Sequence, residues 1–177
     1  MKVARPPPTF PAAAVASPVK AQPASPVDTS AVETKSKAVV LQYFEAFKNG
    51  DVAAMKKLYA PGATFKDNMF DLPNRDSILK MWGKAPPFES YKLEVLGVKG
   101  NEVHTRWTVD YKMFGHKVHN VVDSRIAVNA DGQIASQRES WDQSKWLSQA
   151  LPVIPKWGQG LAMMVMRPLV NMRTVVD

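Results

Sequence analysis

The residues best suited to proton transfer lie in segment 131–142, Asp-Gly-Gln-Ile-Ala-Ser-Gln-Arg-Glu-Ser-Trp-Asp. Its first residues, Asp131-Gly132, are typical of a type I′ turn, in which both central residues take positive φ, and a strand-like alternation follows. Because side chains two apart share a strand face, Gln137, Glu139 and Trp141 are expected on one side. A carboxylate between a carboxamide and an indole is unusual for packing and predicts a partly polar cavity inside a curved sheet. In an apolar cavity a carboxyl group resists ionisation, so its pKa rises and it can carry protons near neutral pH.

Length and composition indicate one globular domain. The chain has 177 residues, of which 45% are hydrophobic and 22% charged, enough for a sizeable core. It contains no cysteine, which excludes disulfides, thiolate nucleophiles and zinc-finger ligation. The net charge of +7 falls partly on the two ends, and the basic residues between them are interleaved with acidic ones. We therefore expect no nucleic-acid partner.

The N-terminal segment differs from the rest of the chain. Residues 1–29 are rich in Pro and Ala and can neither pair in a sheet nor bury a core, so we expect a disordered tail before a domain over residues 30–151. A cytoplasmic location is expected. Export is the alternative, because Lys2 and Arg5 precede a short apolar stretch, although Pro11 interrupts it.

Residues 152–177 form a C-terminal extension. It contains the most apolar run of the chain, Leu161–Met166, which is too short to span a membrane. Methionines pack adaptably, so we expect this run to pack on the domain or on a dimer partner. A weak association with a membrane surface, through Trp157 and these methionines, is the alternative.

Three helices are expected at the start of the domain. Ser30–Glu33 reads Ser-Ala-Val-Glu, a capping box, and the helix that follows should end at Asn49-Gly50. Asp51 should cap a second helix, which Pro61-Gly62 would end, and Asn74 should cap a third.

The second half of the domain has the period of strands. After a short strand expected over Thr64–Met69, apolar residues alternate from Tyr91 to Trp141, with breaks at three glycine-containing turns. Helices followed by four antiparallel strands indicate an α+β fold, with the helices covering one face of the sheet. The side chains expected to line a pocket are Trp82, Trp107, Asn120, Gln137 and Trp141.

Three segments share their order and spacing with a known family. They are Tyr43–Asp51, Pro61–Asp67, and Asp131–Ile134 leading to Trp141-Asp142 and Trp146. Through them residues 32–151 resemble the nuclear transport factor 2-like superfamily, in its SnoaL-like and ketosteroid-isomerase-like branch. The resemblance implies a cone-shaped, curved antiparallel sheet packed against three N-terminal helices, with a cystatin-like fold and a deep central pocket. It also implies a homodimer, a small apolar carbonyl compound as ligand, and acid–base isomerisation or cyclisation without a cofactor.

The resemblance implies three catalytic residues. Tyr43, eight positions before Asp51, matches the tyrosine that helps to form the oxyanion hole of ketosteroid isomerases. Asp67 matches their general base, at the end of the first strand. Glu139 stands where SnoaL-like cyclases carry an acidic residue, but Gln137 replaces the histidine that is common two positions before it.

Ordinary structural roles stay open for the same residues. Tyr43 lies on an apolar helix face and could be core, and Asp67 could cap the loop that follows it. Glu139 could pair with Arg106 or Lys112 if the strand had the opposite phase. The rival hypothesis is therefore a ligand-binding or oligomerisation module without chemistry.

Several other kinds of site are disfavoured. Ketosteroid isomerases carry a second acid on the penultimate strand, and Asp123 is the residue of this chain that comes closest to that position. It is out of phase with the inward residues of its strand and should point outward beside Arg125. Epoxide hydrolases of the superfamily need an arginine and an aspartate where this chain has Trp107 and Val109. His116 and His119, three residues apart on one strand, should lie on opposite faces, and His104 should lie on the outer face, so no metal site is expected. No phosphate-binding loop or serine elbow is present.

Overall fold

The computed structural model describes residues 29–154 and Gly158. The tail was expected over residues 1–29; Thr29 instead begins α1, and residues 1–28 and the apolar run 161–166 lie outside the described residues. Four helices and six strands follow one another in the order α1 (Thr29–Lys48), α2 (Val52–Leu58), β1 (Tyr59–Lys66), β2 (Asp71–Leu72), α3 (Arg75–Trp82), β3 (Phe88–Lys99), β4 (Glu102–Met113), β5 (His116–Val128), β6 (Ile134–Trp141) and α4 (Gln143–Ala150).

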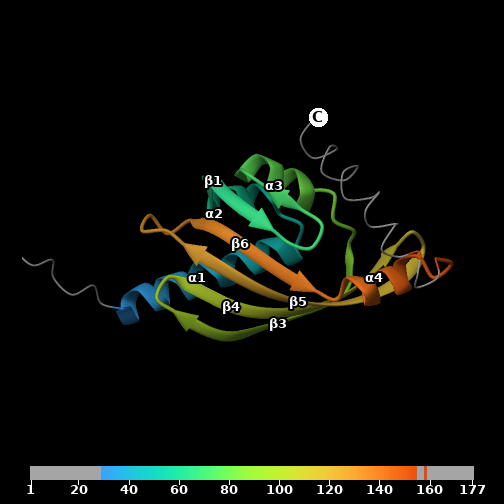
Figure 1. Ribbon diagram of the computed structural model, residues 1–177. Helices are drawn as coiled ribbons and strands as arrows, with labels where there is room; N and C mark the ends of the chain where they lie inside the picture. The colour runs from blue at the N-terminus through green and yellow to red at the C-terminus, as the bar shows by residue number, and fades with distance from the viewer. Residues whose placement is uncertain (1–28, 155–157, 159–177) are drawn as a thin grey trace, which may run out of the picture.

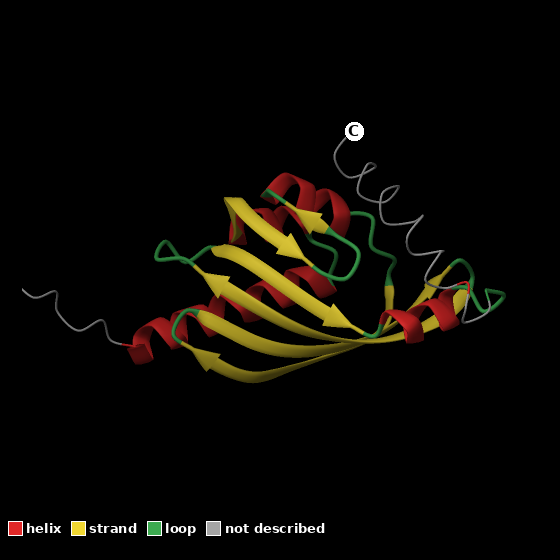
Figure 2. Cartoon of the chain, in the orientation of Figure 1, coloured by secondary structure: helices red, strands yellow, loops and turns green. Residues whose placement is uncertain are grey.

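All six strands form one curved, open sheet in the order β2-β1-β6-β5-β4-β3 (Figure 1). Helix α1 packs against β3, β4 and β5, and α3 packs against β1, so the first three helices cover one face (Figure 2). The expected α+β architecture is confirmed. No helix within residues 29–154 is long and apolar enough to cross a membrane.

Local hydrogen bonds confirm two predicted helix starts. The carboxylate of Asp51 accepts from the backbone N–H of Ala54 (2.8 Å), and the side chain of Asn74 accepts from Ser77 N (2.9 Å). The capping box at Ser30 is not confirmed, because Ser30 lies inside α1. The partner residue Glu33 instead accepts from the backbone N–H of Gly100 (3.0 Å), which ties α1 to the β3–β4 turn.

The first strand departs from the prediction. Helix α2 already ends at Leu58, and Pro61-Gly62 lies within β1 instead of ending the helix. Strand β1 runs parallel to β6, so the sheet is mixed and not wholly antiparallel. The register between these strands shifts between Tyr59 and Thr64, around the Pro-Gly pair, where proline cannot donate a ladder hydrogen bond.

The meander from β3 to β6 is confirmed, but its type I′ turn is elsewhere. Positive φ at both central residues occurs at Phe114 (51°) and Gly115 (83°), between β4 and β5. At Asp131-Gly132 only the glycine has positive φ (82°). There Asn129 controls the turn, since its side chain accepts from Gln133 N (2.8 Å) and its carbonyl from Gly132 N (3.0 Å).

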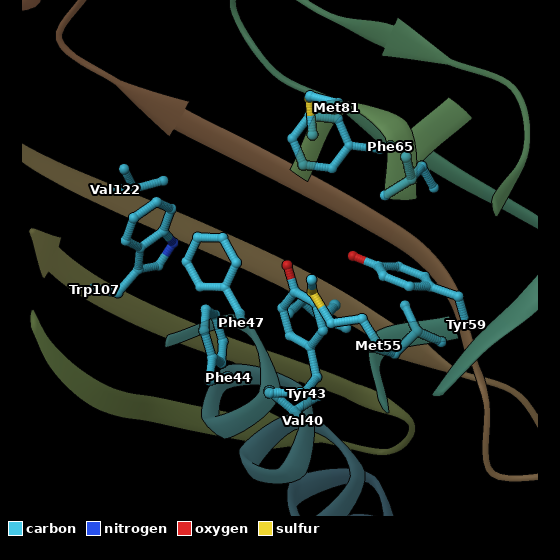
Figure 3. Close-up of a cluster of buried hydrophobic side chains, with 14 of the residues drawn as sticks. Val40, Tyr43, Phe44, Phe47, Met55, Tyr59, Phe65, Met81, Trp107 and Val122 are labelled. Carbon is cyan, nitrogen blue, oxygen red and sulfur yellow. The ribbon is translucent and has the colours of Figure 1, made fainter. Parts of the chain in front are cut away.

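The predicted strand phase places the core correctly. Aromatic residues of α1 pack on the inward residues of β4, with 5.3 Å between the ring centroids of Phe47 and Trp107 (Figure 3). On the opposite face Asp123 points outward, as expected. Its partner is Arg106 (Nε–Oδ1, 2.8 Å) and not Arg125, which pairs with Glu102.

Candidate functional site

A cavity of about 420 Å³ lies between the inner face of the sheet and helix α3. Its wall is mainly aromatic and aliphatic and is built from the ends of α1 and α3, the β1–β2 and α3–β3 loops, the start of β3, strands β4 to β6 with the β4–β5 turn, and α4. The charged or amide side chains in this wall are Asp67, Lys84, Asn120 and Glu139. Such a wall suits a largely apolar ligand with few polar groups.

Most of the residues expected at the pocket belong to this wall. They are Asp67, Trp82, Trp107, Asn120, Glu139 and Trp141. Two others, Tyr43 and Gln137, are fully buried and lie outside the wall. The alternation of β6 correctly puts Gln137 on the inner face, but α1 and β1 cover it there, because the cavity occupies only part of that face.

Glu139 is held by a chain of neutral donors. Its Oε1 accepts from Ser124 Oγ (2.8 Å) and from Gln137 Nε2 (2.6 Å). The indole N–H of Trp107 donates to Ser124 Oγ (3.0 Å), which leaves the serine hydroxyl to donate onward to Glu139. Ser124 is fully buried on the inner face of β5, and its hydroxyl gains this role only from the strands on either side, so no sequence signal marked it as part of a site.

Burial raises the pKa of Glu139 to about 7. The hydrogen bonds from Ser124 and Gln137 oppose this rise, and the negative charge of Asp67 adds to it. None of the ion pairs among the described residues includes Glu139. A carboxyl group in this state can both take up and release a proton near neutral pH.

Two buried tyrosines set the orientation of Gln137. The hydroxyl of Tyr59 donates to Gln137 Oε1, so the amide nitrogen faces Tyr43 Oη (3.2 Å) and Glu139 (2.6 Å). The hydroxyls of Tyr43 and Tyr59 point into the same region between α1 and β1 (Figure 3). Burial raises the pKa of both tyrosines, so both stay neutral. Tyr59 was expected on a helix face, where no sequence signal pointed to this contact.

Asp67 directly follows β1 and organises the loop after it. Its Oδ1 accepts from the backbone N–H groups of Met69 (2.7 Å) and Phe70 (2.5 Å), and its Oδ2 accepts from Trp141 Nε1 (3.2 Å). This is the loop-capping role that the sequence left open. The structure therefore brings Asp67 and Glu139 to one cavity, where Asp67 is already bonded to three donors.

The described residues contain no group of three or more His, Asp or Glu side chains that could hold a metal ion. His119 and His116 are exposed and His104 is half-buried. His119 Nδ1 lies 2.7 Å from Asp110 Oδ1, on exposed side chains outside the cavity wall.

Comparisons with known proteins agree with this architecture. The family model described as SnoaL-like domain matches residues 40–137, more than half of the chain. A search of curated proteins found no match.

Solved structures share the fold at low identity. An LEH-like epoxide hydrolase of M. tuberculosis is 16% identical, with 76% of this chain and 97% of that chain covered and a TM-score of 0.56. The epoxide hydrolase/cyclase-like enzyme SalBIII, which has a role in pyran ring formation in polyether salinomycin, is 18% identical. The match covers 64% of this chain and 95% of that chain, with a TM-score of 0.53. A putative ketosteroid isomerase from Kribbella flavida is 14% identical (62% and 79% covered, TM-score 0.52). These likenesses show the fold alone, whereas the match to the family model shows that the chain belongs to the SnoaL-like domain family.

Proposed function

We propose that this domain binds a small, largely apolar molecule in its cavity and that Glu139 transfers a proton on it. The observation that carries this proposal is a buried carboxyl group with a pKa of about 7 in a mainly apolar wall. A merely structural carboxylate at such a site would ordinarily have a cationic partner, because an unpaired buried charge is costly.

The chemistry that fits a single proton carrier is isomerisation or cyclisation of a carbonyl compound. Ionised Glu139 removes a proton from the carbon beside the carbonyl group, which gives an enolate and a neutral carboxyl group. In an isomerisation the same group then returns the proton to another carbon, so no proton is gained or lost overall. A pKa near 7 leaves comparable amounts of both forms for these two steps.

Glu139 is a better candidate for the base than Asp67. The carboxylate of Asp67 accepts three hydrogen bonds that hold the loop between β1 and β2 and the Trp141 indole, so its oxygens are already engaged. Tyr43, the expected oxyanion donor, does not reach the wall, and Gln137 lies between it and Glu139. In this proposal Asp67 shapes the mouth of the cavity and acts on Glu139 through its charge.

Asn120 gives the ligand a second polar contact. It lies on β5 four residues before Ser124, about 13 Å along the strand. A ligand held by Asn120 at one end and by Glu139 at the other would therefore be elongated, with an apolar body and a polar group near each end. This description fits fused-ring ketones better than compact metabolites.

Proton exchange tests the proposal without knowledge of the natural substrate. Steroid ketones, terpenoid ketones and aromatic polyketides are first screened for thermal stabilisation of the full chain, since a ligand that binds only the folded state raises its melting temperature. Each ketone that binds is then incubated with the protein in D₂O, and loss of its α-protons is followed by NMR. We expect Glu139→Gln to slow this exchange by about 10²-fold or more. The matched control is Glu102→Gln, an exposed glutamate on the outer face of β4.

The alternative is binding without chemistry. It is favoured by Gln137, which cannot exchange protons, and by the burial of Tyr43 outside the wall. The same experiment separates the two functions, because a ketone that stabilises the protein but exchanges no faster than in buffer would support binding alone.

A further inference from the structure

The amide of Gln137 could meet Glu139 with either of its ends. Its nitrogen can only donate a hydrogen bond, and its oxygen can only accept one. An ionised carboxylate needs a donor, whereas a protonated carboxyl group can itself donate to the amide oxygen. The orientation of this side chain is therefore linked to the protonation of Glu139, and the nitrogen favours the ionised form. In the structure the nitrogen faces Glu139 (Nε2–Oε1, 2.6 Å).

We infer that Tyr59 is a positioning residue, whose hydroxyl holds the amide of Gln137 in this orientation and so keeps Glu139 a proton acceptor. Among the described residues, Gln137 Oε1 accepts from Tyr59 Oη alone. A reversed amide would turn its oxygen toward Glu139 and give up this bond. Tyr59 does not belong to the cavity wall, so it acts on the site through Gln137. The consequence for catalysis rests on the proton transfer proposed for Glu139.

Tyr59 is suited to this role because its surroundings fix its position. Its side chain is fully buried, and its backbone N–H donates to Met55 O at the end of α2, which fixes the start of β1. Its ring packs edge-on against Tyr43, with 5.4 Å between the ring centroids and an interplanar angle of 75°. Burial raises the pKa of Tyr59, so its hydroxyl keeps the proton that it donates to Gln137.

Tyr43 touches the same amide but does not set its direction. Its Oη accepts from Gln137 Nε2 (3.2 Å), the nitrogen that also donates to Glu139. Loss of this hydroxyl would leave Tyr59 bonded to the amide oxygen and the nitrogen facing Glu139. The two tyrosines should therefore affect Glu139 differently, although both are fully buried and each hydroxyl makes one hydrogen bond to Gln137.

The titratable groups around Glu139 come from several parts of the chain. They are Asp67 in the loop after β1, Lys84 in the loop after α3, Tyr43 on α1, Tyr59 on β1 and Tyr91 on β3. Burial raises the pKa of all three tyrosines, so they stay neutral. Replacing a tyrosine by phenylalanine therefore changes no charge near Glu139, and its effect on Glu139 reports the hydrogen bonds.

Titration of the Glu139 carboxyl group tests the inference without any substrate. Glutamate is labelled with ¹³C at Cδ in the full chain, and the Glu139 signal is identified by its absence from Glu139→Gln. We expect Tyr59→Phe to raise the pKa of Glu139 by about one pKa unit, the order of effect of one hydrogen bond to a buried charge. Tyr43→Phe, the matched control, should not raise it. If proton exchange on a ketone occurs, its pH profile should move upward in Tyr59→Phe and not in Tyr43→Phe.

A second variant shows whether Tyr59 acts through the amide. Gln137→Met keeps the length of the side chain and removes its donor, so it should also raise the pKa of Glu139. Adding Tyr59→Phe to Gln137→Met should then cause no further change, because the group that Tyr59 orients is absent.

Three results would overturn the inference. The first is an equal pKa of Glu139 in the wild type and in Tyr59→Phe, and the second is an equal rise in both tyrosine variants. The third is a further rise when Tyr59→Phe is added to Gln137→Met. If circular dichroism shows that Tyr59→Phe does not fold, Gln137→Met decides by itself, since an unchanged pKa of Glu139 there rejects any role of the amide. A shifted pKa together with ketones that bind but do not exchange would contradict the proposed function and leave the role of Tyr59 intact.

Discussion

Glu139 should make the folded protein less stable as pH rises from about 4.5 to about 7. The folded state binds the proton of this carboxyl group more tightly than the unfolded chain does, because burial raises the pKa from 4.5 to about 7. Below this window both states are protonated and the group has no effect. Above it both are ionised, and folding carries the whole cost of burying the charge. At about 1.4 kcal/mol per pKa unit, that cost is on the order of 3 kcal/mol.

Glu139→Gln removes the charge and keeps the shape. The amide oxygen can still accept from Ser124 Oγ and Gln137 Nε2, the two donors that now bind Oε1. The variant should therefore match the wild type near pH 4.5 and exceed its unfolding free energy by about 3 kcal/mol above pH 7. A gain in stability on loss of the candidate catalytic group is expected where an active site stores an unfavourable charge.

Urea denaturation at a series of pH values measures this difference. The unfolding free energies of wild type and Glu139→Gln are compared between about pH 5 and about pH 8, with Glu102→Gln as the control for loss of an exposed carboxylate. A difference between Glu139→Gln and wild type that stays constant over this range would refute the reasoning, since the protonation of Glu139 would then not be linked to folding.

Three further substitutions test the surroundings of the site and one helix cap. Ser124→Ala removes the hydroxyl donor to Glu139, so the pKa of Glu139 should rise further. In the same denaturation experiment, the pH range over which stability falls should therefore move upward. A pH range that stays in place would mean that this bond does not favour the charged form. Asp67→Asn removes a negative charge that adds to the effect of burial, so the pKa of Glu139 should fall and the window should move downward, and an upward move would contradict the assignment. Asn74→Ala removes the cap of α3 and should lower the unfolding free energy by about 1 kcal/mol in urea, whereas Ser77→Ala, which keeps the capped backbone N–H, should cost less.

Features that depend on neighbours in sequence were predictable. The caps at Asp51 and Asn74 need only a side-chain oxygen and a backbone N–H three residues later. The two-residue alternation of the strands placed Trp107, Ser124 and Glu139 on the inner face, because it depends only on strand geometry. The same reasoning failed at the β5–β6 turn, where the side chain of a residue before the Asp-Gly pair sets the loop.

The site itself depended on contacts between distant segments. Tyr59 is the first residue of a strand and not part of the preceding helix, because β1 pairs in parallel with β6, which lies more than seventy residues later in the chain. That pairing brings Tyr59 to Gln137, and the amide so oriented separates Tyr43 from the cavity.

The sequence by itself determined the class of fold, the inward phase of the strands and the presence of a carboxylate on the last strand. Only the tertiary structure decided which inward residues reach the cavity and which are covered, and that burial raises the pKa of Glu139 to about 7. The physical reason is that a pKa depends on burial and on donors from several elements, and these are set by packing between segments far apart in the chain.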